Sequence, residues 1–196
     1  MIKKSFILGI AALSFVTFST QTFAAGDMYT VEKGESLWDI GKEKSVSVIQ
    51  LKEANNLKSN EIQPGQTIEI PDNNVTKEDR ELLAKLVHAE AKGEPYAGKV
   101  AVATVVLNRV DSTEFPDTIK NVIYQVSNGH YAFSPVQNGQ INQAPSQEAR
   151  DAVQEALAFR GQGKGSLFFY NPVTSTSDWI TNRETLLTIG KHRFAK

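Results

Sequence analysis

The sequence predicts an α+β chain built from two modules: a small β-α-α-β module, then a mostly helical domain that carries a small β-sheet. In residues 28–71, short alternating apolar runs bounded by Gly, Pro and Asn enclose two stretches with helical spacing. In residues 77–160, apolar residues recur at helical spacing, and a compact apolar run follows a glycine-rich stretch just beyond. A polar linker, residues 72–76, separates the two modules.

Residues 1–24 are predicted to be a secretory signal peptide. Lys3 and Lys4 give a basic start, an apolar run from Phe6 to Phe18 follows, and Thr22-Phe23-Ala24 offers small residues for cleavage after Ala24. The apolar run is too short for a transmembrane anchor, which is the alternative reading. Because the chain has no cysteine, neither a disulfide nor a lipid-modified cysteine is available. We therefore expect an exported protein without a stable membrane anchor.

The charge of the chain excludes some classes of partner. The formal net charge is −1, and removal of Lys3 and Lys4 with the signal peptide would change it to −3. A slightly acidic chain does not favour binding to nucleic acid or to an anionic membrane.

The first module reads as a strand, two helices and a second strand. Residues 29–31 form a short β-branched strand, and Ser36 is placed to cap a helix that opens with residues 37–40. Val46 to Ala54 has helical spacing, and Thr67 to Pro71 alternates as a second strand that Pro71 ends. This module is too small to bury a large core alone.

Three stretches of this module, Tyr29 to Ile40, Leu51 to Asn55 and Ile62 to Pro71, resemble a LysM domain from end to end. The resemblance implies binding of the N-acetylglucosamine-containing glycan of peptidoglycan or chitin, in a groove between two loops. Carried over, one wall of the groove is Gly34, Glu35, Ser36 and Leu37, and the other is Asn55, Leu57, Gln63 and Pro64. The alternative for Gly34 and Pro64 is that they only shape turns.

The second module, residues 77–196, begins with four predicted helices. Thr76 is a suitable N-cap for the first, which runs from Lys77 to Lys92, and acidic residues fill its first turn. The later helices are predicted over residues 98–110, 116–125 and 147–160, the last capped by Ser146 and ended by Gly161. Valines in residues 98–110 could indicate a strand, but the length and the alanines favour a buried helix. Residues 166–170 then read as a strand.

Glu90 is the unusual residue of the first helix of this module. At about 100° per residue, Leu82, Leu83, Leu86 and Val87 cover roughly 140° of the helix, and Glu90 projects into the centre of that stripe. A carboxylate in an apolar setting is either paired with a cation, here Arg109 or Arg183, or holds its proton at an elevated pKa. The second state suits a general acid. Periodicity alone leaves both readings open.

Several other chemistries lack their residues. The run His88-Ala89-Glu90 begins like a zinc deaminase motif, but no cysteine completes the site. The three histidines, His88, His130 and His192, are far apart in sequence, so a zinc amidase site would require them to converge in the fold. The chain has no G-x-S-x-G nucleophile elbow and no phosphate-binding glycine loop.

Four motifs in order are similar to the spore cortex-lytic cell-wall hydrolase family. They are residues 88–110, residues 131–139, Phe169-Tyr170-Asn171-Pro172, and Trp179-Ile180 together with residues 189–194. Lys191 departs from the family pattern, in which Asn is common between Gly and His. The resemblance implies a lysozyme-like or lytic-transglycosylase-like fold and places the catalytic Glu of the family at Glu90.

The implied reaction is cleavage of the β-1,4 bond between N-acetylmuramic acid and N-acetylglucosamine in peptidoglycan of the cell wall or the spore cortex. As a lytic transglycosylase, Glu90 would act as general acid and then as base, with no second carboxylate. A lysozyme-like hydrolase usually needs one, and Glu94, Asp111 and Asp178 are candidates. The residues implied to contact substrate are Glu94, Tyr131, Phe133, Tyr170, Asn171 and Trp179. The alternative for each aromatic residue is core packing.

No cofactor or metal is implied, and we expect a monomer whose partner is the glycan strand. The protein is expected to be secreted and associated with the cell wall or spore envelope. Two alternatives remain open at this point: an N-acetylmuramoyl-L-alanine amidase, and a wall-binding protein without catalysis.

Overall fold

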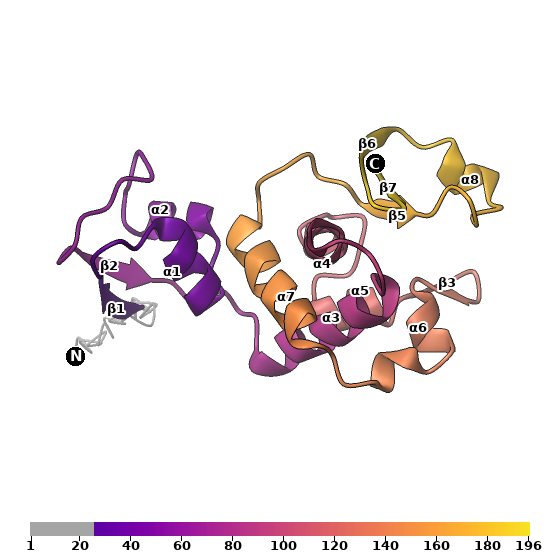
Figure 1. Ribbon diagram of the computed structural model, residues 1–196, viewed down its shortest axis with the longest axis horizontal. Helices are drawn as coiled ribbons and strands as arrows, with labels where there is room; N and C mark the ends of the chain where they lie inside the picture. Colours follow the sequence, from indigo (N-terminus) through magenta and orange to yellow (C-terminus); the bar gives the residue numbers. More distant parts are fainter. Residues whose placement is uncertain (1–25) are drawn as a thin grey trace, which may run out of the picture.

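The computed structural model describes residues 26–196, so the predicted signal peptide lies outside the described residues. Two modules lie side by side, and helix α7 (Gln147–Phe159) stands between the first module and the rest of the second (Figure 1). Within this described part, no helix combines the length and the apolar character that crossing a membrane requires.

The first module has the predicted β-α-α-β order. Strands β1 (Asp27–Thr30) and β2 (Thr67–Ile70) pair antiparallel, and α1 (Leu37–Lys44) and α2 (Val48–Ala54) pack on them. Helix α2 begins two residues later than predicted, because Ser47 caps it by accepting a hydrogen bond from the backbone N–H of Gln50. The core of the module consists of Val31, Leu37, Ile40, Val46, Val48, Leu51 and Ile68.

The helices of the second module build its main core. Helix α3 (Lys77–Glu90) starts at the predicted cap, where Thr76 and Asp79 form a capping box, and it ends at Glu90, before the predicted Lys92. Helix α4 (Tyr96–Val110) starts directly after Pro95, whose ring presets a φ of −61°. Its central valines, Val102, Val105 and Val106, are fully buried and the helix packs against α3 and α7, which confirms the helix over the strand.

Shorter elements follow α4. Helix α5 (Ile119–Ile123) is shorter than the predicted 116–125, because Thr118 caps it. A two-residue hairpin, β3 (Val126–Ser127) and β4 (His130–Tyr131), leads to α6 (Ser134–Gln137) and a 3-10 turn (Gln140–Asn142). The hairpin, α6 and the 3-10 turn are not among the elements that the sequence predicted.

The C-terminal third forms a three-stranded antiparallel sheet. Its order is β5 (Phe168–Tyr170), β7 (His192–Ala195), β6 (Thr185–Ile189), so the last strand in the sequence is the central one. Helix α8 (Asp178–Thr181) lies in the connection from β5 to β6. Phe194 of β7 is fully buried in the main core and faces Phe169 of β5 across the pair, which attaches the sheet to the helices. The fold is thus α+β in both modules, as predicted.

Candidate active site

Glu90 is the last residue of α3, at the edge of the main core. Its side chain is partly buried, and Leu83, Leu86 and Val87 of the same helix are fully buried. Burial raises the pKa of the Glu90 carboxyl from 4.5 to about 7, and the charge of Arg109 opposes this rise. At neutral pH the protonated and the ionised forms of this carboxyl are therefore present in comparable amounts. A group that donates a proton in one step and accepts one in another needs both forms.

Arg109 of α4 is the cation whose charge acts on the pKa of Glu90. It is buried, its Nε–H donates to the carbonyl oxygen of Leu167 at 2.7 Å, and its guanidinium lies 5.0 Å from the ring centres of Phe115 and Phe133. Burial lowers the pKa of Arg109, and the charge of Glu90 opposes that shift. Arg109 acts on Glu90 through charge and not through a hydrogen bond, so the site is not a tight ion pair.

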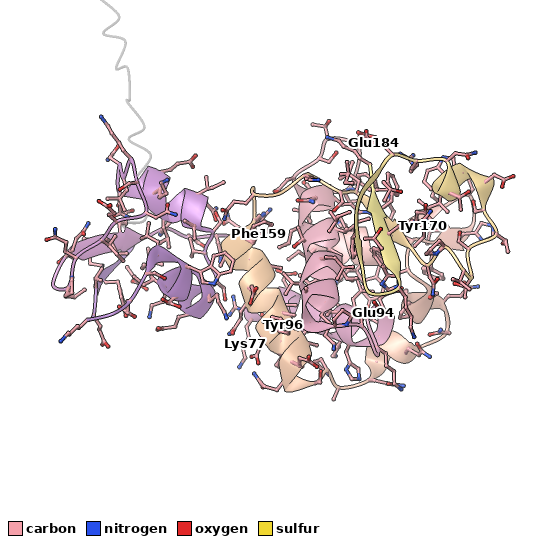
Figure 2. All side chains as sticks on the ribbon, turned by 45° about the horizontal axis from the view of Figure 1, so that its top comes forward. Lys77, Glu94, Tyr96, Phe159, Tyr170 and Glu184 are labelled. Carbon is pink, nitrogen blue, oxygen red and sulfur yellow. The ribbon has the colours of Figure 1, made fainter. Side chains whose placement is uncertain are left out.

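Glu94 lies one turn beyond Glu90 in sequence but serves a different part of the fold. Its buried carboxylate accepts the backbone N–H of Lys191 at 2.9 Å, in the turn of the β6–β7 hairpin (Figure 2). Gly190 has a φ of +57°, and a Cβ at that position would overlap Glu94 Oε2. Glu94 therefore ties the hairpin to the loop after α3. Because the bond uses the backbone of residue 191, the Lys191 departure from the family pattern does not affect it.

His192 is next to this contact. Its Nδ1 lies 4.0 Å from Glu94 Oε2, and its ring packs edge-on against Phe169 and Phe194. Burial lowers the pKa of His192, and Glu94 opposes the shift. The imidazole is therefore mostly neutral at pH 7. Sequence analysis assigned no role to this histidine.

The aromatic residues implied to contact sugar divide into two groups. Phe133 is buried in the main core, stacked on Phe169 with ring centres 6.3 Å apart, which is the core-packing alternative. Tyr170 is also buried, and among the described residues its hydroxyl has no hydrogen-bond partner. Tyr131 and Trp179 are 44% and 61% exposed, so their rings can receive a sugar face.

Trp179 belongs to a cation–π stack that sequence analysis missed. The Arg183 guanidinium lies 4.2 Å from the ring of Trp179 and 3.9 Å from that of Phe168, and these two rings meet edge-on. Neighbouring Asn171 uses its side-chain oxygen to accept the backbone N–H of Val173, which shapes the turn after β5. The available signal for the stack was a Trp in the short helix α8 followed four positions later by an Arg just past the end of that helix.

Tyr131 belongs to an exposed apolar surface on the β3–β4 hairpin. It pairs across the strands with Val126, which is 54% exposed, and Tyr124 before the hairpin is 41% exposed. The tight turn is Asn128-Gly129, with both φ values positive. An Asn-Gly pair between β-branched and aromatic residues is a strong hairpin signal that could have located this surface in the sequence.

The other candidate carboxylates are not equivalent to Glu90. Asp111 forms a bidentate salt bridge with Arg160, in which the shortest distance, from Nη2 to Oδ1, is 2.6 Å. Asp111 also lines a cavity of about 550 Å³ between the two modules, together with residues of the linker. Asp178 is exposed at the start of α8. Within residues 26–196, no three or more His, Asp or Glu side chains are grouped so that they could hold a metal ion.

In the first module, half of the residues implied to bind glycan also hold the local fold. Leu37 is a core residue, Ser36 caps α1, Glu35 accepts the Tyr29 hydroxyl at 2.7 Å, and Asn55 joins the end of α2 to Glu69 of β2. The remaining positions, Gly34, Leu57, Gln63 and Pro64, are exposed or partly exposed on the two loops. The two loops therefore have defined shapes, and their outer surfaces are accessible.

Two family profiles match the chain. The family described as Cell Wall Hydrolase matches residues 93–195, beginning just after Glu90, and the LysM domain matches residues 29–71. Both agree with the resemblances found in the sequence.

Individual proteins are similar to the second module. The spore cortex-lytic enzyme of Oceanobacillus iheyensis is 44% identical over 121 residues, which cover 62% of this chain and 42% of that protein. The spore cortex-lytic enzyme of Halalkalibacterium halodurans is 45% identical over 116 residues, covering 59% and 34%. The chain thus spans about two-fifths or less of the length of these relatives.

A solved structure is also similar. The catalytic domain of the germination-specific lytic transglycosylase SleB from Bacillus anthracis superposes with a TM-score of 0.57 at 41% sequence identity. The match covers 64% of this chain and 99% of that domain. The second module therefore corresponds to a complete domain of known fold.

Proposed function

Because the chain belongs to the cell wall hydrolase family and carries a LysM domain, we propose that it is an exported peptidoglycan glycosidase in which Glu90 is the general acid and base. The LysM module binds the glycan, and the second module cuts the β-1,4 bond between N-acetylmuramic acid and N-acetylglucosamine. Export by the signal peptide, action as a monomer, and residence at the wall or spore envelope are parts of this proposal.

The observation that carries the proposal is the position of Glu90 at the edge of the main core, where burial raises the pKa of its carboxyl to about 7. An ordinary glutamic acid with a pKa of about 4.5 holds its proton in only roughly 0.3% of molecules at pH 7. With a pKa of about 7, Glu90 is protonated in about half of them. Protonation of a leaving sugar oxygen needs such an acid. The likeness of the second module to a lytic transglycosylase domain supports the same reading.

The proposed reaction is transglycosylation in two proton transfers. Glu90 donates its proton to the bridging oxygen as the bond from muramic C1 to that oxygen breaks, and N-acetylglucosamine leaves with a new 4-hydroxyl. The resulting Glu90 carboxylate removes the proton of the muramic C6 hydroxyl while C6 oxygen bonds to C1. The products are a 1,6-anhydro ring and a protonated Glu90, so no water is consumed. The nearby charge of Arg109 stabilises the transient carboxylate.

Two of the three other candidate carboxylates are already engaged, which favours this route over a lysozyme-like one. A retaining hydrolase needs a second carboxylate as nucleophile near the sugar. Glu94 is buried and bonded to the Lys191 backbone, and Asp111 is paired with Arg160. Neither is available without breaking its present contact, so the exposed Asp178 is the one remaining candidate for such a nucleophile.

The test is digestion of purified vegetative sacculi and spore cortex by the wild type and by Glu90→Gln, followed by mass spectrometry of the fragments. We expect 1,6-anhydromuramic ends from the wild type and none from the variant. New reducing ends would show that the reaction is hydrolysis and not transglycosylation. Free stem peptides would show that the protein is an amidase. If Glu90→Gln cuts as well as the wild type, Glu90 is not the catalytic acid. Glu114→Gln, which changes an exposed carboxylate of the same kind, is the matched control.

A further inference from the structure

Helix α7 is buried on a side that does not face the core of its own module. Ala149, Val153, Ala156 and Leu157 belong to the main core. At about 100° per residue, Ala158 projects roughly 160° to 180° away from Ala149 and Ala156. Ala158 is nevertheless fully buried. Something outside the main core must therefore cover this outer face.

Helix α1 of the LysM module covers it. The ring of Trp38 meets that of Phe159 edge-on with centres 6.3 Å apart, and Phe159 lies at the border between the modules (Figure 2). Gly41 is also buried, and a Cβ there would lie 3.4 Å from the Cβ of Ala158. A glycine opposite an alanine lets the two helices approach closely, as in a packed helix pair.

Polar contacts reinforce the same face. Lys42 Nζ of α1 lies 3.6 Å from Glu155 Oε2 of α7, and that oxygen also accepts the Tyr96 hydroxyl of α4 at 3.0 Å. Glu155 thus connects three helices from two modules. Past the end of α7, Gly161 has a φ of +81°, and a Cβ there would lie 3.1 Å from Ile49 of α2.

The linker between the modules is held at both ends. The side-chain amide of Asn73 donates to the carbonyl oxygen of Ser45 in the LysM module, and its oxygen accepts the backbone N–H of Val75 at 2.9 Å. Val75 is itself buried in the core of the second module. A linker fixed in this way does not behave as a flexible coil.

These contacts leave the glycan side of the LysM module free. They use Trp38, Gly41, Lys42, Ser45 and Ile49, and none of these is among the residues implied to bind glycan. The module is therefore docked by one face and accessible by another.

We propose that the outer face of α7 is a docking surface for the LysM module. The two modules then move as one rigid body, and the second module is not joined to the LysM module by a flexible linker. The glycan bound by the LysM module then stands at a fixed distance and orientation from Glu90. Fixing both in advance removes the entropy cost of bringing them together. The docking stands on the contacts alone, whereas its consequence for cutting rests on the proposed function.

The docking is tested by Ala158→Arg, with Gln154→Arg as the matched control, since Gln154 is exposed on the same helix. Circular dichroism first establishes that both variants are folded. In small-angle X-ray scattering of the chain from residue 25 onward, we expect the wild type and Gln154→Arg to fit the docked arrangement, and Ala158→Arg to be longer. A wild type that already scatters as two independently moving bodies, or an Ala158→Arg that scatters like the control, would overturn the proposal.

If Ala158→Arg does not fold, charge reversal serves as the second test. Lys42→Glu puts a second negative charge next to Glu155 and should increase the particle length measured by scattering. Adding Glu155→Lys restores opposite charges and should reduce that length again. Lys44→Glu, on the same helix but paired with neighbouring Glu43, is the control and should have no effect. No change in Lys42→Glu relative to this control would count against the docking.

The consequence for cutting is tested on glycan strands of mixed length. Relative to Gln154→Arg, Ala158→Arg should lose about tenfold in rate on long strands that engage both modules. Its rate on fragments too short to reach the LysM module should stay within about twofold. Equal losses on both substrates would mean damage to the cutting site and would refute the rigid coupling. If neither protein cuts glycan, the proposed function fails, whereas the scattering result still decides the docking.

Discussion

Replacement of Glu90 by Gln is expected to abolish lysis and at the same time to stabilise the protein above pH 7. The fold raises the pKa of Glu90 from 4.5 to about 7, so the ionised form is less stable in the folded than in the unfolded chain. This cost is absent below pH 4.5, grows as the pH rises toward 7, and is constant above 7. Glutamine carries no charge at any of these pH values and avoids the cost.

The size of the effect follows from the shift. At about 1.4 kcal/mol per pKa unit, the ceiling is roughly 3 kcal/mol. Because the side chain is only partly buried, solvent screens part of this, and we expect about 1–2 kcal/mol. For a protein of this size that corresponds to a melting temperature about 3–6 °C higher for Glu90→Gln at pH 8.

Scanning calorimetry of the wild type, Glu90→Gln and the exposed control Glu114→Gln at pH 4.5 and pH 8 measures this difference. The melting temperature of Glu90→Gln should exceed that of the wild type at pH 8 but not at pH 4.5. The melting temperature of Glu114→Gln should equal that of the wild type at both pH values. If Glu90→Gln melts at or below the wild type at pH 8, the raised pKa is wrong. The wild-type rate should also fall about tenfold between pH 6 and pH 8, since the acid form is lost above pH 7; a flat profile would contradict the assignment.

Three further substitutions probe the surroundings of the site. Glu94→Ala removes the carboxylate that accepts the N–H of Lys191 in a part-buried hydrogen bond and should cost about 1–3 kcal/mol in denaturant unfolding. Glu184→Ala, exposed at the other end of β6, should cost nothing measurable. Gly190→Ala places a Cβ against Glu94 at a positive φ and should also destabilise, but less in a Glu94→Ala background; strictly additive losses would rule out that contact. Arg109→Met removes a charge that lowers the pKa of Glu90, so the fall in rate should shift to higher pH; an unchanged or lower midpoint would show that Arg109 does not act on Glu90.

Local patterns predicted the helices well. The α3 cap at Thr76 and the α7 cap at Ser146 were visible as capping residues ahead of periodic apolar stretches, and both form as expected. The valines of α4 were ambiguous in sequence, and only burial on several sides explains why a β-branched run is helical. The family resemblances were likewise visible, because their motifs are contiguous.

Contacts between distant residues were not predictable from periodicity. Glu94 and Lys191 are 97 positions apart, and nothing in either segment indicates that a carboxylate will bind that particular amide. Ala158 looks like any helical alanine, because its burial depends on a helix from the other module. Elements of two to four residues, such as β3, β4 and α8, are too short to show a period.

The order of the C-terminal sheet has a consequence for the sequence in which the second module folds. Within residues 26–196, strands β5 and β6 do not pair with each other, and each pairs only with β7, residues His192–Ala195. During synthesis the helices can form before β7 arrives, but the pairing of Phe169 with Phe194 cannot, and the Lys191–Glu94 hydrogen bond needs the hairpin turn that leads into β7. Removal of residues 192–196 would therefore leave the LysM module intact and deprive β5 and β6 of the strand that joins them. The three-stranded sheet can therefore assemble only once β7 is present, so the folding of the second module depends on the strand that is made after the two it joins.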